Sequence, residues 1–389
     1  MPSNHNVRLR GITWNHSRGF LPMVATAQRF SETHPGVEII WEKRSLQEFA
    51  DYPVEKLAET FDLLVIDHPF AGYAARRRIL VPLDEQLDAD FLADQSRNSV
   101  GRSHESYFYG GHQWALAIDA ATPVSAWRAD LLANAKTGPP ETWQELLALA
   151  RRGLVAFPSI PVDSLMNFYI FCCALGEEPF TPDNVLIGAE AGSEALAMLR
   201  ELVSLSPPEI LSWNPIATYE AMARRDDIAY CPFAYSYSNY ARQGYAQNVL
   251  QFGDLCWIRG AEPARTTLGG TGLAVSTACQ NPEVALDYAR YVASPGCQRT
   301  LYVQSGGQPG HRSAWVDSEA NRSTGDFFRN TLPALERAYL RPRYSGYIYF
   351  QDHASPIVHR FLREGGNPQP VMRELQGVYE RSKESEAGS

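Results

Sequence analysis

The chain has 389 residues, of which 44% are hydrophobic and 20% charged, and its formal net charge at pH 7 is −9. This length is enough for two domains of ordinary size, and the composition is typical of a globular protein rather than a disordered one. No apolar run reaches the roughly 18–20 residues of a membrane-spanning helix, so we expect no membrane insertion. The acidic balance also argues against nucleic-acid binding, for which a basic face is expected.

The N-terminal part of the chain alternates between predicted strands and helices. Residues 8–14 form the first strand, Ser17 is a candidate cap for the helix that follows, and Pro22 fits in its first turn. One face of that helix carries apolar side chains, namely Phe20, Met23, Val24, Ala27 and Phe30. The next elements are a strand at 37–41, a helix at 55–60, a buried strand at 62–66 and a helix to about 78. This βαβαβ order predicts a parallel open sheet, with ligands beyond the carboxyl ends of its strands.

A later segment has the pattern of a strand that ends, turns and resumes toward a new helix. Two apolar runs, 114–118 and 123–127, are separated by the polar residues 119–122. Thr142 and Glu145 then have the spacing of a capping box at the start of a helix. We interpret this segment as the passage of the chain from one lobe to another.

The rest of the chain continues the alternation of strands and helices. The patterns predict strands at 154–157, 228–233 and 267–276, helices at 163–175 and 194–204, and a helix capped by Asn281 with Pro282 at its first position. The stretch 234–240, which follows one of these strands, is polar and rich in tyrosine. Beyond residue 310 the chain is expected to be mostly helical, with a frayed tail at 383–389.

The N-terminus and the cysteines bear on where the protein works. Residues 1–6 are polar and a strand follows at once, so no export signal is visible. The six cysteines, which include the adjacent Cys172 and Cys173, show no C-x-x-C spacing, and four of them lie in apolar surroundings that favour inert buried thiols. Free thiols persist more safely in the cytoplasm than outside it, so a cytoplasmic location stays open.

Five segments together resemble a known family. They are His34–Ile39 (HPGVEI), the strand 62–66 with Leu80–Asp84 (LVPLD), Gly110–Leu132, Pro139–Leu147 and Gly269–Pro295. In this order they closely resemble family 1 extracellular solute-binding proteins of the maltose-binding-protein type, the ligand-capturing subunits of ABC importers. Each segment alone is a weak signal, but five in the family's order are specific, and the resemblance covers most of residues 7–315.

The resemblance implies an α/β fold of the bilobal periplasmic-binding-protein type II, with a hinge and a ligand cleft. Lobe one would contain residues 1–119 and 267–315, and lobe two residues 120–266 and 316–382. The protein would close this cleft on a carbohydrate or a similar polar organic solute and deliver it to an ABC permease from the periplasm. We expect a monomer that uses no cofactor.

Polar and aromatic residues at predicted strand ends and in loops are the candidate ligand-binding residues. They are Trp14, His16, Asp67, His68, Asp119, Trp213, Tyr235, Tyr237, Gly269, Gly270, Thr271 and Arg312. Aromatic rings can lie against sugar ring faces, and glycines let backbone N–H groups approach a ligand. Plain core packing is an even alternative for any single aromatic residue, and Asp119 can equally pair with an arginine such as Arg128.

Catalytic alternatives are weaker. His16, Asp67 and His68 have the chemistry of a metal site or an acid–base pair, but turn polarity and strand-end capping explain them without catalysis. The sequence contains no H-E-x-x-H, G-x-S-x-G or phosphate-loop lysine. Enzymes of the thiaminase I type resemble these proteins but use a hinge cysteine, and residues 118–120 here contain none. We therefore predict a binding protein without catalytic or metal-ligating residues; the alternatives are a cytoplasmic enzyme that uses the same cleft and a cytoplasmic ligand sensor.

Overall fold

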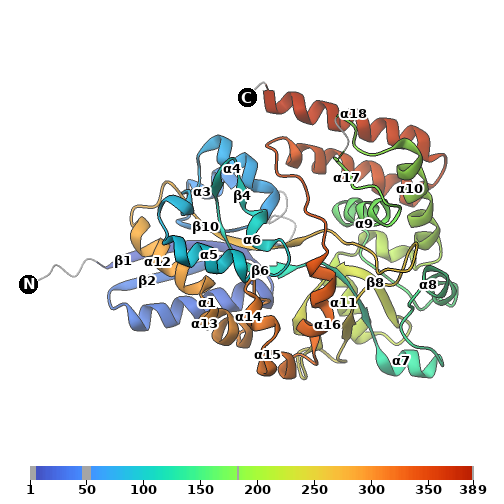
Figure 1. Ribbon diagram of the computed structural model, residues 1–389. Coiled ribbons are helices and arrows are strands. Elements are labelled where there is room, and N and C mark those ends of the chain that lie inside the picture. The colour runs from blue at the N-terminus through green and yellow to red at the C-terminus, as the bar shows by residue number, and fades with distance from the viewer. Residues whose placement is uncertain (1–5, 46–53, 182–183, 388–389) are drawn as a thin grey trace, which may run out of the picture. The chain divides into compact units, whose positions relative to one another are not determined.

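The computed structural model describes residues 6–45, 54–181 and 184–387, which form two compact units (Figure 1). Unit 1 contains the described residues through Ala121, together with Gly269–Arg322 and Arg343–Ser345. Unit 2 contains Thr122–Leu268, Ser323–Pro342 and the described residues from Gly346 onward. Unit 1 differs from the predicted lobe one at its boundaries, because it includes residues 120–121, 316–322 and 343–345 and does not include residues 267–268.

Unit 1 is built on a five-stranded sheet with the order β2-β1-β3-β10-β6. Its strands are β1 (Val7–Trp14), β2 (Val37–Arg44), β3 (Leu63–Ile66), β6 (Leu116–Ala121) and β10 (Gly269–Val275). β1 pairs in parallel with β2 and β3, as predicted, but β10 runs antiparallel to both β3 and β6. The sheet is therefore mixed rather than parallel, because β10 comes back from unit 2 instead of following a crossover helix.

Helices and short elements surround this sheet. The helices are α1 (Ser17–Thr33), α3 (Val54–Ala58), α4 (Ala71–Arg77), α5 (Ala89–Arg97), α6 (Ser103–Ser106), α12 (Pro282–Ala293), α13 (Pro295–Cys297), α14 (Arg312–Trp315) and α15 (Ser318–Ser323), with short helical turns η1 (His68–Phe70), η2 (Leu83–Glu85) and η5 (Gln298–Tyr302). A two-stranded hairpin joins β4 (Phe108–Tyr109) to β5 (His112–Gln113).

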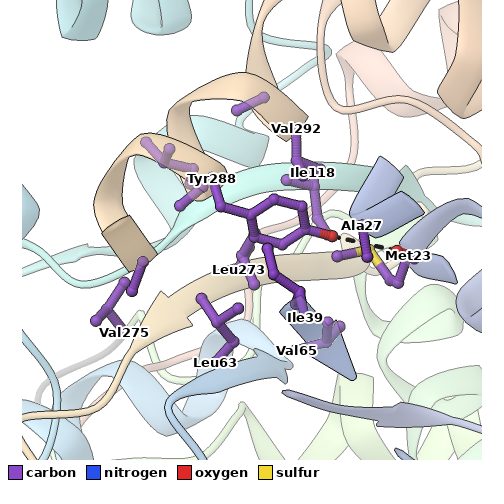
Figure 2. Close-up of a cluster of buried hydrophobic side chains, with 14 of the residues drawn as sticks. Met23, Ala27, Ile39, Leu63, Val65, Ile118, Leu273, Val275, Tyr288 and Val292 are labelled. Atoms are coloured by element: carbon purple, nitrogen blue, oxygen red, sulfur yellow. Dashed lines mark hydrogen bonds between the residues drawn. The ribbon is translucent and has the colours of Figure 1, made fainter. Parts of the chain in front are cut away.

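The core of unit 1 lies between the sheet and helices α1 and α12 (Figure 2). Buried aliphatic side chains from β2, β3, β6 and β10 meet Met23 and Ala27 of α1 and Val292 of α12. Tyr288 of α12 is fully buried among them, and its hydroxyl donates to the backbone oxygen of Met23 at 3.2 Å and accepts from Nε1 of Trp41 at 3.1 Å. These bonds satisfy the one polar atom of a large buried ring, which would otherwise weaken the core.

Unit 2 contains a smaller, antiparallel sheet with the order β8-β7-β9 and a larger share of helices. Its strands are β7 (Pro123–Trp127), β8 (Tyr230–Tyr235) and β9 (Gln251–Gly253). Its helices are α7 (Ala129–Asn134), α8 (Trp143–Ala150), α9 (Pro161–Ala174), α10 (Ala189–Ser204), α11 (Pro215–Arg224), α16 (Phe327–Glu336), α17 (Tyr347–Glu364) and α18 (Pro368–Ala387), with turns η3 (Pro208–Ser212) and η4 (Ser238–Ala241). The buried helix α9 packs against α10 and α17.

Several local predictions are confirmed and others are wrong. The capping box of α8 is present, with Thr142 accepting from the N–H of Glu145 and Glu145 accepting from the N–H of Thr142. α1 is capped by His16 rather than Ser17, and Val24 on that helix is 41% exposed instead of buried. Residues 154–157 form no strand, since only Val155 makes an isolated bridge.

The C-terminal helix is longer than predicted. α18 continues to Ala387, so a frayed tail that begins at residue 383 is wrong, and residues 388–389 lie outside the described residues. Within the part predicted to be frayed, the ammonium group of Lys383 donates to Asn184 Oδ1 at 2.8 Å and lies 3.9 Å from the centre of the Tyr379 ring. Across the described ranges, no helix has the length and apolar character needed to cross a membrane.

Candidate functional site

Unit 1 contains a buried ion pair between α1 and β6. Arg18 donates from Nε to Oδ2 of Asp119 at 2.9 Å and from Nη2 to Oδ1 of the same carboxylate. The two side chains are 4% and 0% exposed. Burial raises the pKa of the Asp119 carboxyl, and the Arg18 guanidinium opposes this rise. The fork of the guanidinium thus fixes the orientation of the carboxylate at the end of the sheet.

The sequence offered two roles for Asp119, and the structure corrects one of them. Arg128 is not its partner, because Arg128 lies in unit 2 and donates to Asp130, to Asp226 and to the backbone oxygen of Met222. The arginine that pairs with Asp119 is Arg18. A contact between Asp119 and a solute stays a prediction.

Trp14 and His16 lie beside Arg18. The Trp14 ring is 3% exposed, and Gly19 covers it so closely that a Cβ at Gly19 would lie 2.3 Å from the ring. The Arg18 guanidinium lies 5.8 Å from the ring centre. His16 accepts the N–H of Arg18 at Nδ1, and burial, assisted by Arg18, lowers its pKa to about 3. His16 is therefore a neutral acceptor at physiological pH, and the Trp14 ring packs beside the guanidinium of the ion pair.

Asp67 and His68 follow β3 and form a cap. Asp67 accepts the backbone N–H of His68 at 2.8 Å, and its carboxylate lies 3.2 Å from Nδ1 of the His68 ring. The His68 side chain is fully buried and meets the ring of Tyr107 edge-on, and the Tyr107 hydroxyl donates to the backbone oxygen of Ile66. These contacts fit the capping role that the sequence offers as an alternative to chemistry.

The glycine-rich start of β10 lies against Asp119. Gly270 has a φ of +94°, and a Cβ there would lie 2.3 Å from the backbone oxygen of Asp119, so only glycine fits without strain. Thr271 pairs with Asp119 across the two strands, and the register shifts after Thr271. The Thr271 hydroxyl is buried and has no hydrogen-bond partner among the described residues. Gly269, Gly270 and Thr271 are therefore brought together with Asp119, Arg18 and Trp14.

Arg312 lies at the start of α14, away from this cluster in its contacts. Its N–H donates to the backbone oxygen of Asn98 at 2.7 Å. The preceding His311 places Nδ1 2.8 Å from the Ser313 hydroxyl and Nε2 3.3 Å from Asp94 Oδ2. This Ser–His–Asp order resembles a catalytic triad, but Nδ1 also accepts the Ser313 N–H as the cap of α14. A helix cap accounts for the arrangement without catalysis.

Of the predicted residues of unit 2, Tyr235 ends β8 and Tyr237 follows it, whereas Trp213 lies between η3 and α11. Trp213 is half-buried, and the Arg225 guanidinium lies 5.6 Å from its ring centre. Tyr235 is half-buried, and its hydroxyl is 2.8 Å from Thr267 Oγ1. Tyr237 is 4% exposed. Tyr219 of α11 contacts both the end of β8 and Tyr237. Its hydroxyl donates to the backbone oxygen of Ala234, and its ring centre lies 6.3 Å from that of Tyr237.

Two charged residues that the sequence reasoning missed belong to these regions. Arg18 was passed over as part of a helix, although its place directly after the strand-end residues Trp14 and His16 was a usable signal. Asp163, in the first turn of α9, is 5% exposed, and burial raises its pKa to about 8. Its position was predicted as the start of a helix, where an exposed acid is ordinary.

The described residues give no support to cysteine or metal chemistry. The six cysteines are free, and burial raises the pKa of each thiol, to about 12 for Cys173, Cys256, Cys279 and Cys297. Such thiols are poor nucleophiles, because the thiolate is the reactive form. In the part of the chain that the structure describes, no group of three His, Cys, Asp or Glu side chains has the geometry to hold a metal ion.

Comparison with known proteins identifies the family. The model of the family described as "Bacterial extracellular solute-binding protein" matches residues 25–319, which is more than half of the chain. The chain belongs to this family. Its members are extracellular binding proteins rather than enzymes, as the resemblance in the sequence implied.

Solved structures of solute-binding proteins have the same fold. Maltose-bound MalE3 of T. maritima has a TM-score of 0.82 at 15% identity, over 96% of this chain and 99% of that one. A solute-binding protein from Agrobacterium radiobacter K84 in complex with ribitol has a TM-score of 0.80 at 19% identity, over 96% and 98%. Lmo0181 from Listeria monocytogenes in complex with cycloalternan has a TM-score of 0.82 at 15% identity, over 97% and 99%. The bilobal α/β fold predicted from the sequence is thereby confirmed.

Within this solute-binding protein, some of the predicted ligand residues of unit 1 lie together around Asp119 and its partner Arg18, whereas Arg312 does not. The candidate group of unit 2 comprises the half-buried aromatic residues Tyr235 and Trp213. The contact of any of these residues with a solute remains a prediction.

Proposed function

We propose that this solute-binding protein captures a carbohydrate or a similar polar organic solute and passes it to an ABC permease. The family match over residues 25–319 carries the proposal. The similar structures that hold maltose, ribitol and cycloalternan support a solute rich in hydroxyl groups. Their sequence identity to this chain is at most 19%, so the choice of solute needs a test of its own.

The chemistry of the two residue groups is compatible with a polyhydroxylated solute. A sugar offers apolar ring faces to aromatic rings and hydroxyl groups that need paired donors and acceptors. Trp213 and Tyr235 of unit 2 supply half-buried aromatic rings. In unit 1, the Thr271 hydroxyl and the Asp119–Arg18 pair supply donors and acceptors. We propose that residues of these two groups bind the solute and that binding shifts the conformational population of the protein.

The proposal also includes a location and a partner. A protein of this extracellular family would act in the periplasm, as a monomer, and deliver its solute to the permease in the closed state. The expected result is that purified protein with bound solute stimulates ATP hydrolysis by the cognate transporter in proteoliposomes. Equal ATP hydrolysis with and without the protein would contradict this part of the proposal.

A thermal-shift screen tests the solute class. Maltose, ribitol and tagatose would be compared with glutamate and sulfate at the same concentrations. A ligand at about 100 times its Kd stabilises the native state by about 2.7 kcal/mol, which is readily measured as a rise in Tm. We expect a rise with at least one sugar or polyol and none with glutamate or sulfate. Stabilisation by the latter alone would exclude the carbohydrate proposal.

A pair of tryptophan variants tests the residue group of unit 2. Trp213→Ala removes a ring from this group, whereas its backbone oxygen, which accepts from Ser159 and Ile160, remains in place. We expect about a tenfold or greater loss of solute affinity, equivalent to at least about 1.4 kcal/mol. Trp257→Ala is the matched control, because Trp257 lies in the same unit and is 37% exposed. Equal effects of the two substitutions in calorimetric titrations would remove Trp213 from the site.

Trp14 is unsuited to such a test. Its ring is 3% exposed and closely covered by Gly19, so Trp14→Ala would leave a cavity in unit 1. Tyr235→Phe is the sharper variant, since it removes only the hydroxyl that bonds Thr267. If that hydroxyl also serves the solute, affinity falls while the Tm without solute changes little.

A further inference from the structure

Within its described residues, unit 2 contains a buried carboxyl group without a charged partner. Asp163 is the third residue of α9 and is 5% exposed, and its Oδ2 has no hydrogen-bond partner in the described ranges. Two serine hydroxyls in neighbouring elements share this lack of a hydrogen-bond partner among the described residues. They are the buried hydroxyl of Ser159, just before α9, and that of Ser355, on the neighbouring helix α17.

The segment that enters α9 is held by hydrogen bonds from several elements. The N–H groups of Ser159 and Ile160 both donate to the backbone oxygen of Trp213, at 3.0 and 3.3 Å. The backbone oxygen of Ser159 accepts from the Ser164 hydroxyl and from His359 Nδ1 of α17, each at 2.8 Å. These bonds therefore connect the start of α9 to the Trp213 loop, which consists of residues 213–214 between η3 and α11.

The protonation state of Asp163 determines the free-energy cost of burying its side chain. A carboxylate that is taken out of water without a cation or donors carries a large desolvation cost, whereas the neutral acid does not. Burial alone raises the pKa of Asp163 to about 8. The titratable groups linked to this region are Cys231 of β8, whose own pKa is raised partly by Asp163, and His359 of α17, which contacts the adjacent Ser164. Neither is a fixed cation that would hold Asp163 ionised.

We propose that Asp163 is a positioning residue: its neutral carboxyl keeps the first turn of α9 folded against the Trp213 loop, and loss of the proton loosens that loop. To hydrate a carboxylate at this depth, the first turn of α9 must open, and the bonds from Ser159 and Ile160 to Trp213 then break. The consequence for solute binding rests on the proposed function, in which Trp213 belongs to the solute site. The proton dependence of the loop does not.

Amide hydrogen exchange at pH 6.5 and pH 9 tests the proposal without a ligand. After correction for intrinsic exchange, the Ser159 and Ile160 amides of the unaltered protein should lose about tenfold or more of their protection at pH 9. Asp163→Asn, which imitates the neutral acid, should keep its protection at both values. Glu145→Gln is the matched control, because Glu145 occupies the same third position of α8 but is exposed. It should behave like the unaltered protein.

Three results would overturn the proposal. They are unchanged protection of Ser159 and Ile160 in the unaltered protein at pH 9, an equal loss in Asp163→Asn, and a rescue by Glu145→Gln. The first of these comes from the unaltered protein, so it needs no variant to fold.

A maltose titration at the same two pH values separates this proposal from the function. If maltose binds, its affinity should fall at pH 9 in the unaltered protein and not in Asp163→Asn. Equal falls in both proteins would overturn the link to the solute site. If maltose does not bind at either pH, that result counts against maltose as the solute, and the exchange data alone decide the role of Asp163.

Discussion

Each unit buries one acidic side chain within its described residues, and the two are stabilised in opposite ways. Asp119 of unit 1 is held by the fork of Arg18, which lies 101 positions earlier in the chain. Asp163 of unit 2 has no ion pair among the described residues, and burial raises its pKa to about 8. The first carboxyl is stabilised by a charge and the second by a proton.

The difference teaches what each site can respond to. A bidentate pair between arginine and carboxylate resists changes of pH near neutrality, because the guanidinium keeps its charge and opposes protonation of its partner. A lone buried acid responds to pH, because the neutral and ionised forms differ by its full desolvation cost. Unit 1 therefore has a fixed polar arrangement near Asp119, while unit 2 has a proton-dependent one near Trp213.

The largest effect is expected from Asp163→Asn. The raised pKa means that the folded state holds a proton between about pH 4 and pH 8 that the unfolded state releases. The stability contributed by that proton is full below about pH 4 and is lost as the pH rises to about 8. A shift from the usual value to about 8 corresponds to about 6 kcal/mol at most, of which about 4 kcal/mol is lost between pH 5 and pH 8. Urea unfolding at pH 5 and pH 9 should show this fall in the unaltered protein and not in Asp163→Asn.

The control for this measurement is again Glu145→Gln. Hydrogen bonds from the N–H groups of Glu141 and Thr142 lower the pKa of Glu145, so its contribution lies above its usual pKa and disappears only in acid. The two variants should therefore change the pH profile at opposite ends. Parallel profiles for Asp163→Asn and the unaltered protein would show that Asp163 is ionised in the fold and would break the comparison with Asp119.

Arg18→Met is expected to have the next largest effect. It leaves the Asp119 carboxylate buried without its charge partner, and breaking a buried pair in this way costs about 3–5 kcal/mol. The loss should shrink as the pH falls, because Asp119 without Arg18 becomes a lone buried acid like Asp163. Urea unfolding of unit 1, followed by tryptophan fluorescence at pH 5 and pH 8, measures both effects.

The double variant Arg18→Met/Asp119→Asn sharpens the comparison. It removes both charges and should recover a large part of the stability lost in the single variant, since no isolated charge remains. A double variant that is as unstable as the sum of the two single variants would mean that the pair acts through packing against Trp14. The contrast between a charge-stabilised and a proton-stabilised carboxyl would then fail for unit 1.

Sequence reasoning predicted what depends on neighbouring residues. The buried strand that holds Leu64, the capping box at Thr142 and the start of α12 after Asn281 follow from local patterns. The antiparallel direction of β10 does not, because it depends on the route of the chain through unit 2. The cap of α1 was misplaced by one residue because both His16 and Ser17 carry an acceptor, and only the backbone geometry decides between them.

The candidate site was predicted less completely than the fold. Predicted strand ends identified Asp119 and Tyr235, and the glycine-rich stretch identified Thr271, although Asp119 lies inside β6 rather than at its end. The pairing of Asp119 with Arg18 joins residues 101 positions apart, and no local pattern could select Arg18 over Arg128. Asp163 was missed because an acid in a first turn is normally exposed, and its burial depends on tertiary packing that no local pattern reveals.

The smallest effect is expected from Thr142→Ala, which removes the cap of α8. This cap bonds Glu145, whose position in α8 corresponds to that of Asp163 in α9. Glu145 and Asp163 are both third residues of their helices, yet the pKa of the first is lowered and that of the second is raised. Thr142→Ala removes the hydroxyl that accepts the N–H of Glu145 and should cost about 1 kcal/mol, as a lost cap usually does. Urea unfolding at pH 7 measures it, with Thr137→Ala, an exposed threonine outside any helix, as control. Because Glu145 is exposed and its pKa is lowered, it stays ionised between pH 6.5 and pH 9. The loss of stability should therefore not change across this range. A loss that grows at high pH would mean that burial is not what separates the two acids.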